Sequence, residues 1–293
     1  MKLSNLQIVL GILFLSLSLS SCSLFDNENP YDEQMKKDRK IIDQYITDND
    51  ISATRTNSGL YYYNLNKGYG TKPASGSIME IKGELYKLDG TLLDDSLHRV
   101  FLADYGTLTY GITEGSLLLN EGGSVNLIIP SGLAFGENSG KYNDVSVEKN
   151  TILRAQIALQ DVRDKEGQKY YETAKIENYL QVNEYMEYEV LDSGVYKVVL
   201  EEGTGEAIGE DIFRLKANYK GTFLDGEEFD KGQNADFRMQ EVITGWKIAL
   251  SSMKKGERAL ILVPSHVAYG FKGNGEILPY STLVFEIELL ETY

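Results

Sequence analysis

The feature that most constrains the fold is an internal repeat with an offset of about 134 residues. The repeat is carried by these pairs of strings: Ser58-Gly59-Leu60-Tyr61 and Ser193-Gly194-Val195-Tyr196; Leu88-Asp89-Gly90 and Leu224-Asp225-Gly226; Ala134-Phe135-Gly136 and Ala268-Tyr269-Gly270. A period this long, present twice, predicts tandem domains rather than a solenoid of short repeats.

Each unit begins with a polar segment whose apolar residues fall at helical spacing, as Ile41, Tyr45 and Ile46 do. A strand-rich region with Asp-Gly turns follows, and such turns favour tight hairpins because glycine tolerates positive φ. In the second unit Phe213, Leu215 and Ala217 alternate with polar residues, which is typical of a half-buried strand.

A short helix is expected further along the second unit. Trp246, Ala249, Leu250 and Met253 recur at i, i+3, i+4 and i+7, and Gly256 is expected to end the helix. Alternation then resumes between Leu283 and Leu289. The pattern by itself predicts an α+β class, with a short helix laid across a curved antiparallel sheet.

The N-terminus carries an export signal. Met1-Lys2 precedes an apolar run that ends in Leu19-Ser20-Ser21-Cys22, which is too short for a resident transmembrane helix. The single cysteine follows the small residues directly, and the string resembles a bacterial lipobox. That resemblance implies lipidation of Cys22 after removal of residues 1–21. An ordinary secretory signal with an incidental cysteine is the alternative.

Location is expected to follow from this anchor. Ser23, not aspartate, follows Cys22, which by resemblance to bacterial lipoprotein sorting implies transfer to the outer membrane. Asp26 and Glu28 make the tether acidic, as in some surface-exported lipoproteins, but Leu24, Phe25 and Asn27 interrupt the run. We expect the periplasmic face rather than the cell surface.

Charge limits the partners. Lysine and arginine total 29 against 44 acidic residues, a formal net charge of −15. Nucleic acids and anionic membrane surfaces are disfavoured, because phosphate contacts need clustered cations. His98 and His266 are the only histidines, so no metal site is expected.

The second unit contains the strings Tyr219 to Asp230, Val242-Ile243-Thr244-Gly245-Trp246 and Ala268-Tyr269-Gly270. Their order resembles the FKBP type of peptidyl-prolyl cis-trans isomerase, over the segment from about Ser193 to Tyr293. The resemblance implies two tandem FKBP-like domains, each a curved antiparallel sheet wrapped on a short helix with a helical lead-in segment.

The resemblance also implies a catalytic pocket. Trp246 forms its floor, Tyr269 donates its hydroxyl to a substrate carbonyl, Asp230 orients at the rim and Ile277 covers the bowl. The walls are Tyr219, Phe229, Val242, Ile243 and Phe285. The loop after Asp230 and the segment at Ile277 are shorter than is usual in the family. No cofactor is implied, because rotation of a prolyl bond needs no proton transfer or covalent intermediate.

The first unit keeps the repeated sequence framework but lacks most of the residues of the catalytic pocket. Its residues at the pocket positions are Ile81 for the tyrosine, Leu93 for Phe229, Thr109 for Ile243, Ile112 for Trp246, Phe135 for Tyr269 and Ala155 for Phe285. Asp94 alone is retained. We therefore expect a degenerate domain, either a spacer or a client-binding module, without isomerase activity.

The expected organisation is a signal peptide at 1–21, a flexible tether at 22–35, a degenerate domain with an N-terminal helix at 36–165, a helical linker at 166–192 and an isomerase domain at 193–293. The expected function is isomerisation of Xaa-Pro segments in exported client proteins at the outer membrane. The alternative is a non-catalytic chaperone, or a fixed subunit of an outer-membrane secretion or assembly complex.

Overall fold

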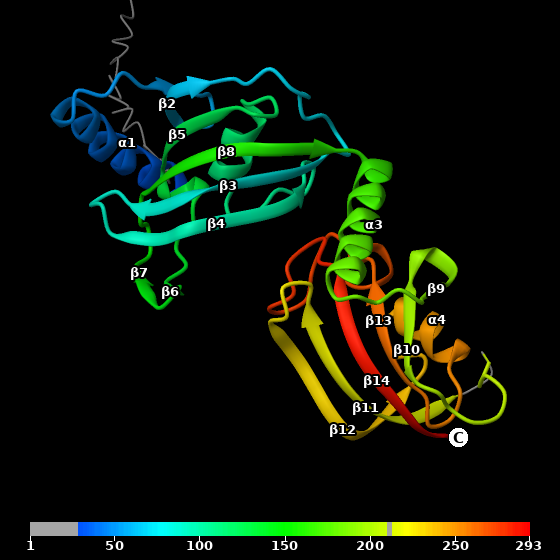
Figure 1. Cartoon of the computed structure of the whole chain (residues 1–293). Coiled ribbons are helices and arrows are strands. Elements are labelled where there is room, and N and C mark those ends of the chain that lie inside the picture. Colours follow the sequence, from blue (N-terminus) through cyan, green and yellow to red (C-terminus); the bar gives the residue numbers. More distant parts are fainter. Residues whose placement is uncertain (1–28, 210–212) are drawn as a thin grey trace, which may run out of the picture.

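The computed structural model describes residues 29–209 and 213–293, and it consists of two domains joined end to end (Figure 1). The first domain contains α1 (Pro30–Asp48), β1 (Thr54–Arg55), β2 (Tyr61–Asn66), β3 (Ile78–Lys87), β4 (Leu92–Leu102), α2 (Tyr110–Leu117), β5 (Ser124–Ile129), the 3-10 turn η1 (Ser131–Leu133), β6 (Gly140–Tyr142), β7 (Val145–Val147) and β8 (Leu153–Arg163). The α+β class is confirmed.

The second domain repeats this order, except that its described residues include no counterpart of β6 and β7. It contains α3 (Lys165–Val182), β9 (Glu189–Val190), η2 (Asp192–Gly194), β10 (Tyr196–Glu201), β11 (Arg214–Phe223), β12 (Glu228–Arg238), α4 (Thr244–Ser252), β13 (Arg258–Val263), η3 (Ser265–Val267) and β14 (Leu283–Thr292). The sheet orders are β1-β2-β5-β8-β3-β4 and, read from the corresponding edge, β9-β10-β13-β14-β11-β12. The paired strands are antiparallel throughout. The tandem domains therefore share one topology.

Each sheet is covered on both faces, as the second domain illustrates. Ala259, Ile261 and Val263 of β13 lie in the cluster that contains α4, whereas Leu260 and Leu262 pack with Ile176 and Leu180 of α3. Two buried faces explain why β13 reads as an almost continuous apolar run rather than a simple alternation. The α4 face is where the expected pocket residues gather.

A buried carboxylate fixes each lead-in helix to the domain that follows it. In the first domain, Asp38 Oδ2 accepts hydrogen bonds from the backbone N–H of Ser131 at 2.7 Å and from its hydroxyl at 2.6 Å. In the second domain, Glu172 accepts the same two bonds from Ser265 at 2.7 and 2.6 Å. Both carboxylates are at least 97% buried, so each is a charge held by short donors.

These two carboxylate–serine contacts, Asp38 with Ser131 and Glu172 with Ser265, are called latches below. They make each lead-in helix a structural part of its domain. Residues 30–35, expected in the tether, are the first turns of α1, because Asn29 caps the helix by accepting from the Tyr31 N–H and Pro30 has a suitable φ for the first helical position. The segment 166–192, expected as a linker, supplies α3 and the edge strand β9 to the second domain.

Two local expectations need correction. Helix α4 ends at Ser252, because Met253 turns to extended geometry and the chain reaches Gly256, at φ 78°, only after a further turn. In α1, Ile42 is fully buried with Tyr45 and Ile46 packed beside it, whereas Ile41 is 51% exposed, so Ile42 takes the place expected for Ile41. The signal segment and Cys22 lie outside the described residues. Within the described ranges, no helix is both long and apolar enough to cross a membrane.

Candidate active site

A pocket of about 370 Å³ opens on the α4 side of the second domain. Eight of the nine side chains expected at the site line it: Tyr219, Phe229, Asp230, Val242, Ile243, Trp246, Tyr269 and Phe285. They come from β11, β12, the start of α4, the turn after η3, and β14. Residues separated by more than sixty positions in the sequence are thus gathered by the sheet and by one short helix.

Trp246 forms the centre of an aromatic cluster. Its ring centroid lies 5.4 Å from that of Tyr219, 5.0 Å from Phe237 and 5.3 Å from Phe285, with interplanar angles of 82°, 62° and 87°. Edge-to-face pairs at these distances are favourable because the positive ring edge meets the negative ring face. Trp246 is only 4% exposed, so its indole is held rigidly at the base of the pocket.

Two glycines allow this close packing. A Cβ on Gly245 would lie 2.3 Å from Val263 Cγ1, so only glycine lets the first turn of α4 approach β13 this closely. A Cβ on Gly221 would lie 2.7 Å from the ring of Phe229. Close packing therefore explains why glycine precedes tryptophan in the motif, because Gly245 sets how deeply Trp246 lies in the pocket.

The polar part of the rim is a tyrosine–carboxylate pair. The Tyr219 hydroxyl donates to Asp230 Oδ2 at 2.9 Å, from β11 to its neighbour β12. Burial raises the pKa of Tyr219 to about 12, helped by the hydrogen bond to the Asp230 carboxylate. Tyr219 is therefore a neutral donor at any physiological pH, and it fixes the orientation of Asp230.

The pocket also holds donors that the protein itself does not use. The indole N–H of Trp246 is buried and has no acceptor among the described residues. The Tyr269 hydroxyl likewise makes no hydrogen bond within that part of the chain, although the residue lines the pocket. The site therefore offers an apolar floor and walls together with unpaired donors for a carbonyl oxygen.

Ile277, the ninth expected residue, does not line the pocket. It is 7% exposed and belongs to the hydrophobic core of the second domain, while its backbone exchanges hydrogen bonds with Asn274. The tight turn needs Gly273, because a Cβ there would lie 2.2 Å from the carbonyl oxygen of Ile277. The short loop thus draws Ile277 inward and leaves Asn274 at the pocket edge.

Five lining residues were missed by sequence reasoning: Asp236, Phe237, Arg238, Glu241 and Asn274. Phe237 matters most, because it packs against both Tyr219 and Trp246. Strand alternation from Phe229 would have found it in a regular strand. The register between β11 and β12 shifts between Ala217 and Tyr219, and that bulge hides the face on which Phe237 lies.

The first domain differs from the expected substitution pattern at one position. Gly83 pairs with Ile157 in the ladder, as Tyr219 pairs with Ile287, so Gly83 and not Ile81 occupies the tyrosine position. The expectation for Ile81 is wrong by two residues, one full step on the same face of the strand.

The pairing of β8 with its other neighbour, β5, agrees with the expectation for Ala155. Ala155 pairs with Leu127, as Phe285 pairs with Ile261. Two rings of the second-domain pocket are therefore absent from the first.

In the first domain, the hairpin β6–β7 fills the space that these two rings occupy in the second domain. Tyr142 on this hairpin packs against the first-domain core and donates its hydroxyl to Asp94 Oδ2 at 2.9 Å. Arg99 donates to the same hydroxyl oxygen at 2.8 Å. Burial raises the pKa of Tyr142 to about 12. The tyrosine–carboxylate pair is thus kept, but its tyrosine comes from a different element and covers the pocket position.

The described part of the chain contains no group of three or more His, Cys, Asp or Glu side chains that could hold an ion. The pocket itself contributes a carboxylate that is already hydrogen-bonded to Tyr219. Its chemistry is that of an apolar binding site with a few fixed donors.

Comparison with known proteins agrees with this geometry. Residues 207–290 match the family described as FKBP-type peptidyl-prolyl cis-trans isomerase. The FKBP-type isomerase FkpA of Escherichia coli K12 is 46% identical over 101 residues, 33% of this chain and 37% of that protein. A probable FKBP-type 25 kDa isomerase of Pseudomonas aeruginosa is 39% identical over 102 residues, 34% of this chain and 44% of that protein. The chain thus spans less than half the length of either relative.

Among solved structures, the crystal structure of Escherichia coli FkpA is 36% identical, covers 41% of this chain and 58% of that chain, and has a TM-score of 0.37. The three FKBP domains of wheat FKBP73 are 23% identical, cover 81% of this chain and 96% of that chain, and have a TM-score of 0.34. The match to the family described as FKBP-type peptidyl-prolyl cis-trans isomerase, residues 207–290, falls on the domain that holds the pocket, and this C-terminal domain is similar to that family.

Proposed function

We propose that the second domain catalyses the cis-trans isomerisation of Xaa-Pro bonds in polypeptide clients. The observation that carries the proposal is the aromatic pocket itself, with Trp246 at its base and the Tyr269 hydroxyl unpaired at its side. The relatives that match this segment bear the name peptidyl-prolyl cis-trans isomerase, which supports the same assignment.

Rotation about an Xaa-Pro bond does not require a chemically reactive side chain. A peptide C–N bond rotates slowly because of its partial double-bond character, with a barrier of about 18–20 kcal/mol. At the twisted geometry the resonance is lost, so the carbonyl no longer shares electrons with the proline nitrogen. A site that binds the twisted form more tightly than either planar form accelerates rotation without forming a covalent intermediate.

The pocket meets these requirements in three ways. The faces and edges of Trp246, Phe237 and Phe285 grip an apolar ring and exclude water from the bond. The Tyr269 hydroxyl can hold a carbonyl oxygen of the substrate in the conformation favoured for twisting. The Tyr219–Asp230 pair keeps the rim rigid, so that the donors and the apolar floor do not reorganise during rotation.

A protease-coupled assay on a short Xaa-Pro peptide tests the catalytic proposal with the mature chain. Trp246→Ala should reduce kcat/KM more than Tyr269→Phe, because the first removes the base of the pocket and the second only one donor. The Tyr269→Phe variant keeps the ring and serves as the folding-neutral member of the pair. A folded wild-type protein without any acceleration would exclude the enzyme.

The cellular setting is a further part of the proposal. We propose that acyl chains on Cys22 hold the protein at the outer membrane, facing the periplasm, where its clients are exported proteins. The motif Leu19-Ser20-Ser21-Cys22 supports this, and each buried methylene contributes about 0.8 kcal/mol to anchoring. Cys22→Ala should release the protein into the soluble fraction. Digestion by protease added to intact cells, with periplasmic controls surviving, would contradict the periplasmic orientation.

A non-catalytic role is the second candidate, and the first domain favours it. There the hairpin β6–β7 covers the pocket position, so an entire FKBP-like domain is kept without an open bowl. Such a domain suits a chaperone or a fixed subunit of a membrane-associated complex. Pull-down from membranes with the Trp246→Ala variant separates the candidates, because unchanged partners and phenotype would place the function on other surfaces.

A further inference from the structure

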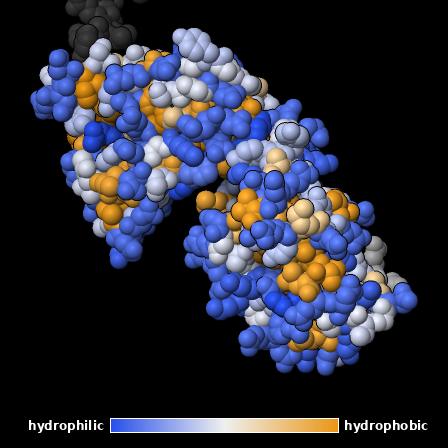
Figure 2. Space-filling model, viewed as in Figure 1, coloured by the Kyte–Doolittle hydropathy of each residue, from blue (hydrophilic) through white to orange (hydrophobic). Residues whose placement is uncertain are grey.

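A second cavity, larger than the aromatic pocket, lies between the two domains. Its volume is about 690 Å³, within the range of about 300–1,000 Å³ typical of ligand sites. The first domain contributes Ile78 and Leu102, α3 contributes Gln168, and the second domain contributes Phe271 and Tyr280. We call it the interdomain groove. Figure 2 shows a notch between the two lobes, with hydrophobic residues at its edge.

The walls of the groove are fixed by a short junction. Strand β8 ends at Arg163 and α3 begins at Lys165, so Asp164 alone joins them, and it caps α3 by accepting from the Gly167 N–H at 2.7 Å. The rings of Tyr105 and Phe271 also meet across the domains, with centroids 4.7 Å apart and an interplanar angle of 44°. The two domains are therefore joined by the chain at Asp164 and by this ring contact.

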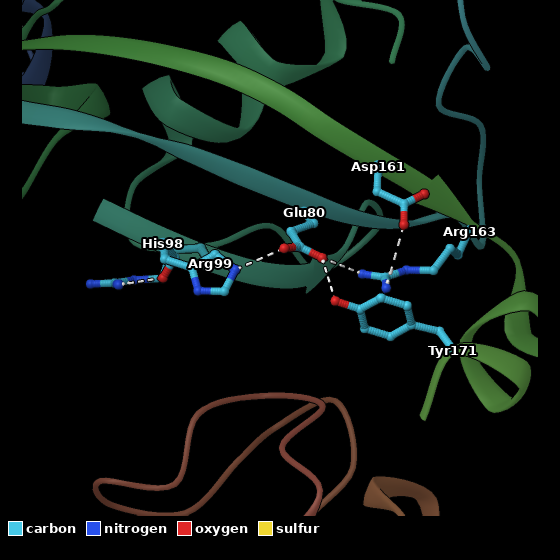
Figure 3. A network of polar contacts seen from close by, with 6 residues as sticks. All are labelled: Glu80, His98, Arg99, Asp161, Arg163 and Tyr171. Atoms are coloured by element: carbon cyan, nitrogen blue, oxygen red, sulfur yellow. Dashed lines mark hydrogen bonds and ion pairs between the residues drawn. The ribbon is translucent and has the colours of Figure 1, made fainter. Parts of the chain in front are cut away.

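A buried ion pair strengthens the junction (Figure 3). Arg163, 8% exposed, donates to Glu80 Oε2 at 2.8 Å, and Tyr171 of α3 donates to the same oxygen at 3.4 Å. The Arg163 guanidinium also lies 3.8 Å from the centroid of the Tyr171 ring. Because Tyr171 is on α3 and Glu80 is on β3, these contacts tie the helix of the second domain to the sheet of the first.

One polar group in the groove lacks a partner. Gln168 is 5% exposed, and its Nε2 donates to Glu172 Oε1 at 2.5 Å. Its Oε1 is buried and receives no hydrogen bond from any described residue. A buried acceptor without a donor is costly, and a backbone N–H of a bound chain would satisfy it. The groove thus combines apolar walls with one unpaired acceptor suited to a polypeptide backbone, and Lys165, Lys169 and Glu166 also line it.

The groove and the aromatic pocket share a rim. Tyr269 lines the pocket, whereas the next two residues, Gly270 and Phe271, line the groove. Consecutive Cα atoms lie about 3.8 Å apart, so the lining of one cavity continues into the lining of the other along the turn at 269–271. An extended chain bound by its proline in the pocket needs only a few residues to cross this turn.

We propose that the interdomain groove is a second subsite for the polypeptide client, binding an apolar stretch that flanks the proline held in the aromatic pocket. The inference rests on the proposed function for its occupant. The Gln168 amide oxygen accepts a backbone N–H of the client, and the apolar walls at Ile78, Leu102 and Phe271 take one of its side chains. The first domain therefore acts as a specificity element that extends the site beyond the proline.

Binding measurements on the full mature chain test this without requiring turnover. Fluorescence anisotropy gives the Kd of a labelled four-residue Xaa-Pro peptide and of two longer peptides, extended with apolar residues toward either end. Six extended residues reach about 20 Å, which is enough to cross the shared rim. The wild type should bind one of the longer peptides at least about fivefold more tightly than the short one, a gain that corresponds to one good contact.

The internal repeat supplies matched controls. Gln168→Leu and Phe271→Ala should each remove most of that gain while leaving the Kd of the short peptide unchanged, which also shows an intact pocket. Gln34→Leu is the control, because Gln34 Nε2 donates to Asp38 at 2.7 Å just as Gln168 does to Glu172. Equal affinity of the wild type for short and long peptides, or a gain that survives both groove variants, would overturn the subsite.

The outcome stays separable from that of the proposed function. If the long-peptide gain is present and sensitive to the groove variants but no peptide is isomerised, the groove stands and the catalytic proposal falls. If the short peptide is isomerised and the groove variants have no effect on either Kd, the catalytic proposal stands and the groove falls.

Discussion

The buried latch between Glu172 and Ser265 should make a large and localised contribution to stability. Ser265→Ala removes a hydroxyl that donates at 2.6 Å to a carboxylate only 3% exposed. Hydrogen bonds to charged groups contribute about 1.5–3 kcal/mol, so we expect the free energy of unfolding of the second domain to fall by about 2 kcal/mol. With a urea m-value of about 2 kcal/mol/M, the midpoint should drop by about 1 M.

The unfolding transitions of the two domains can be followed separately. Trp246 is its single tryptophan and lies in the second domain, so tryptophan fluorescence follows that domain alone, whereas far-UV circular dichroism follows both. Ser131→Ala removes the equivalent bond to Asp38, at 2.6 Å, and should shift only the dichroism transition of the first domain. A change below about 0.5 kcal/mol in the fluorescence transition of Ser265→Ala, the range of ordinary surface substitutions, would refute the latch.

Three further predictions follow from the described contacts. The hydrogen bond from His98, opposed by burial and aided by Arg163, lowers the pKa of Glu80 to about 2, so its carboxylate stabilises the fold above about pH 4.5 and loses this effect as the pH falls towards 2. Glu80→Gln should therefore cost up to about 3 kcal/mol at pH 7 and flatten the acid limb of first-domain stability, measured by urea titration at several pH values; parallel pH curves for the two proteins would count against it. Gly245→Ala places a Cβ 2.3 Å from Val263 Cγ1 and should cost about 1–3 kcal/mol by fluorescence-detected unfolding, despite the better helix propensity of alanine; an unchanged midpoint would show that β13 yields easily. Because the pKa of Tyr219 is about 12, kcat/KM should show no titration of this group between about pH 6 and pH 9, and a Tyr219→Phe variant with a different pH profile in that window would disagree with a neutral donor.

The sequence predicted the second-domain pocket well, because the FKBP-like strings fall on fixed points of the sheet. Gly245 and Trp246 lie in the first turn of α4, and Tyr219 and Phe285 lie on the neighbouring strands β11 and β14. Ile277 was placed at the pocket wrongly and Phe237 was missed, because a short loop and a β-bulge change which face a residue occupies. Periodicity cannot locate such irregularities.

The first domain shows the same limit. The tyrosine position falls on Gly83 and not on Ile81, because strand pairing fixes it and only the ladder reveals that pairing. The cover supplied by Tyr142 had no counterpart in the second domain from which it could be inferred. The latches were equally hidden, since Asp38 and Glu172 look like surface charges until the 3-10 turns are placed against them.

The central claim is that one of the two FKBP-like domains, the second, carries the catalytic pocket. NMR exchange spectroscopy on an Xaa-Pro peptide measures the cis-trans rate directly with the mature chain and two matched variants. Phe135 occupies in the first domain the place that Tyr269 has in the second. We predict strong acceleration by the wild type and by Phe135→Ala, and loss of at least about tenfold with Trp246→Ala. Acceleration that survives Trp246→Ala but disappears with Phe135→Ala would contradict the assignment of the pocket to the second domain.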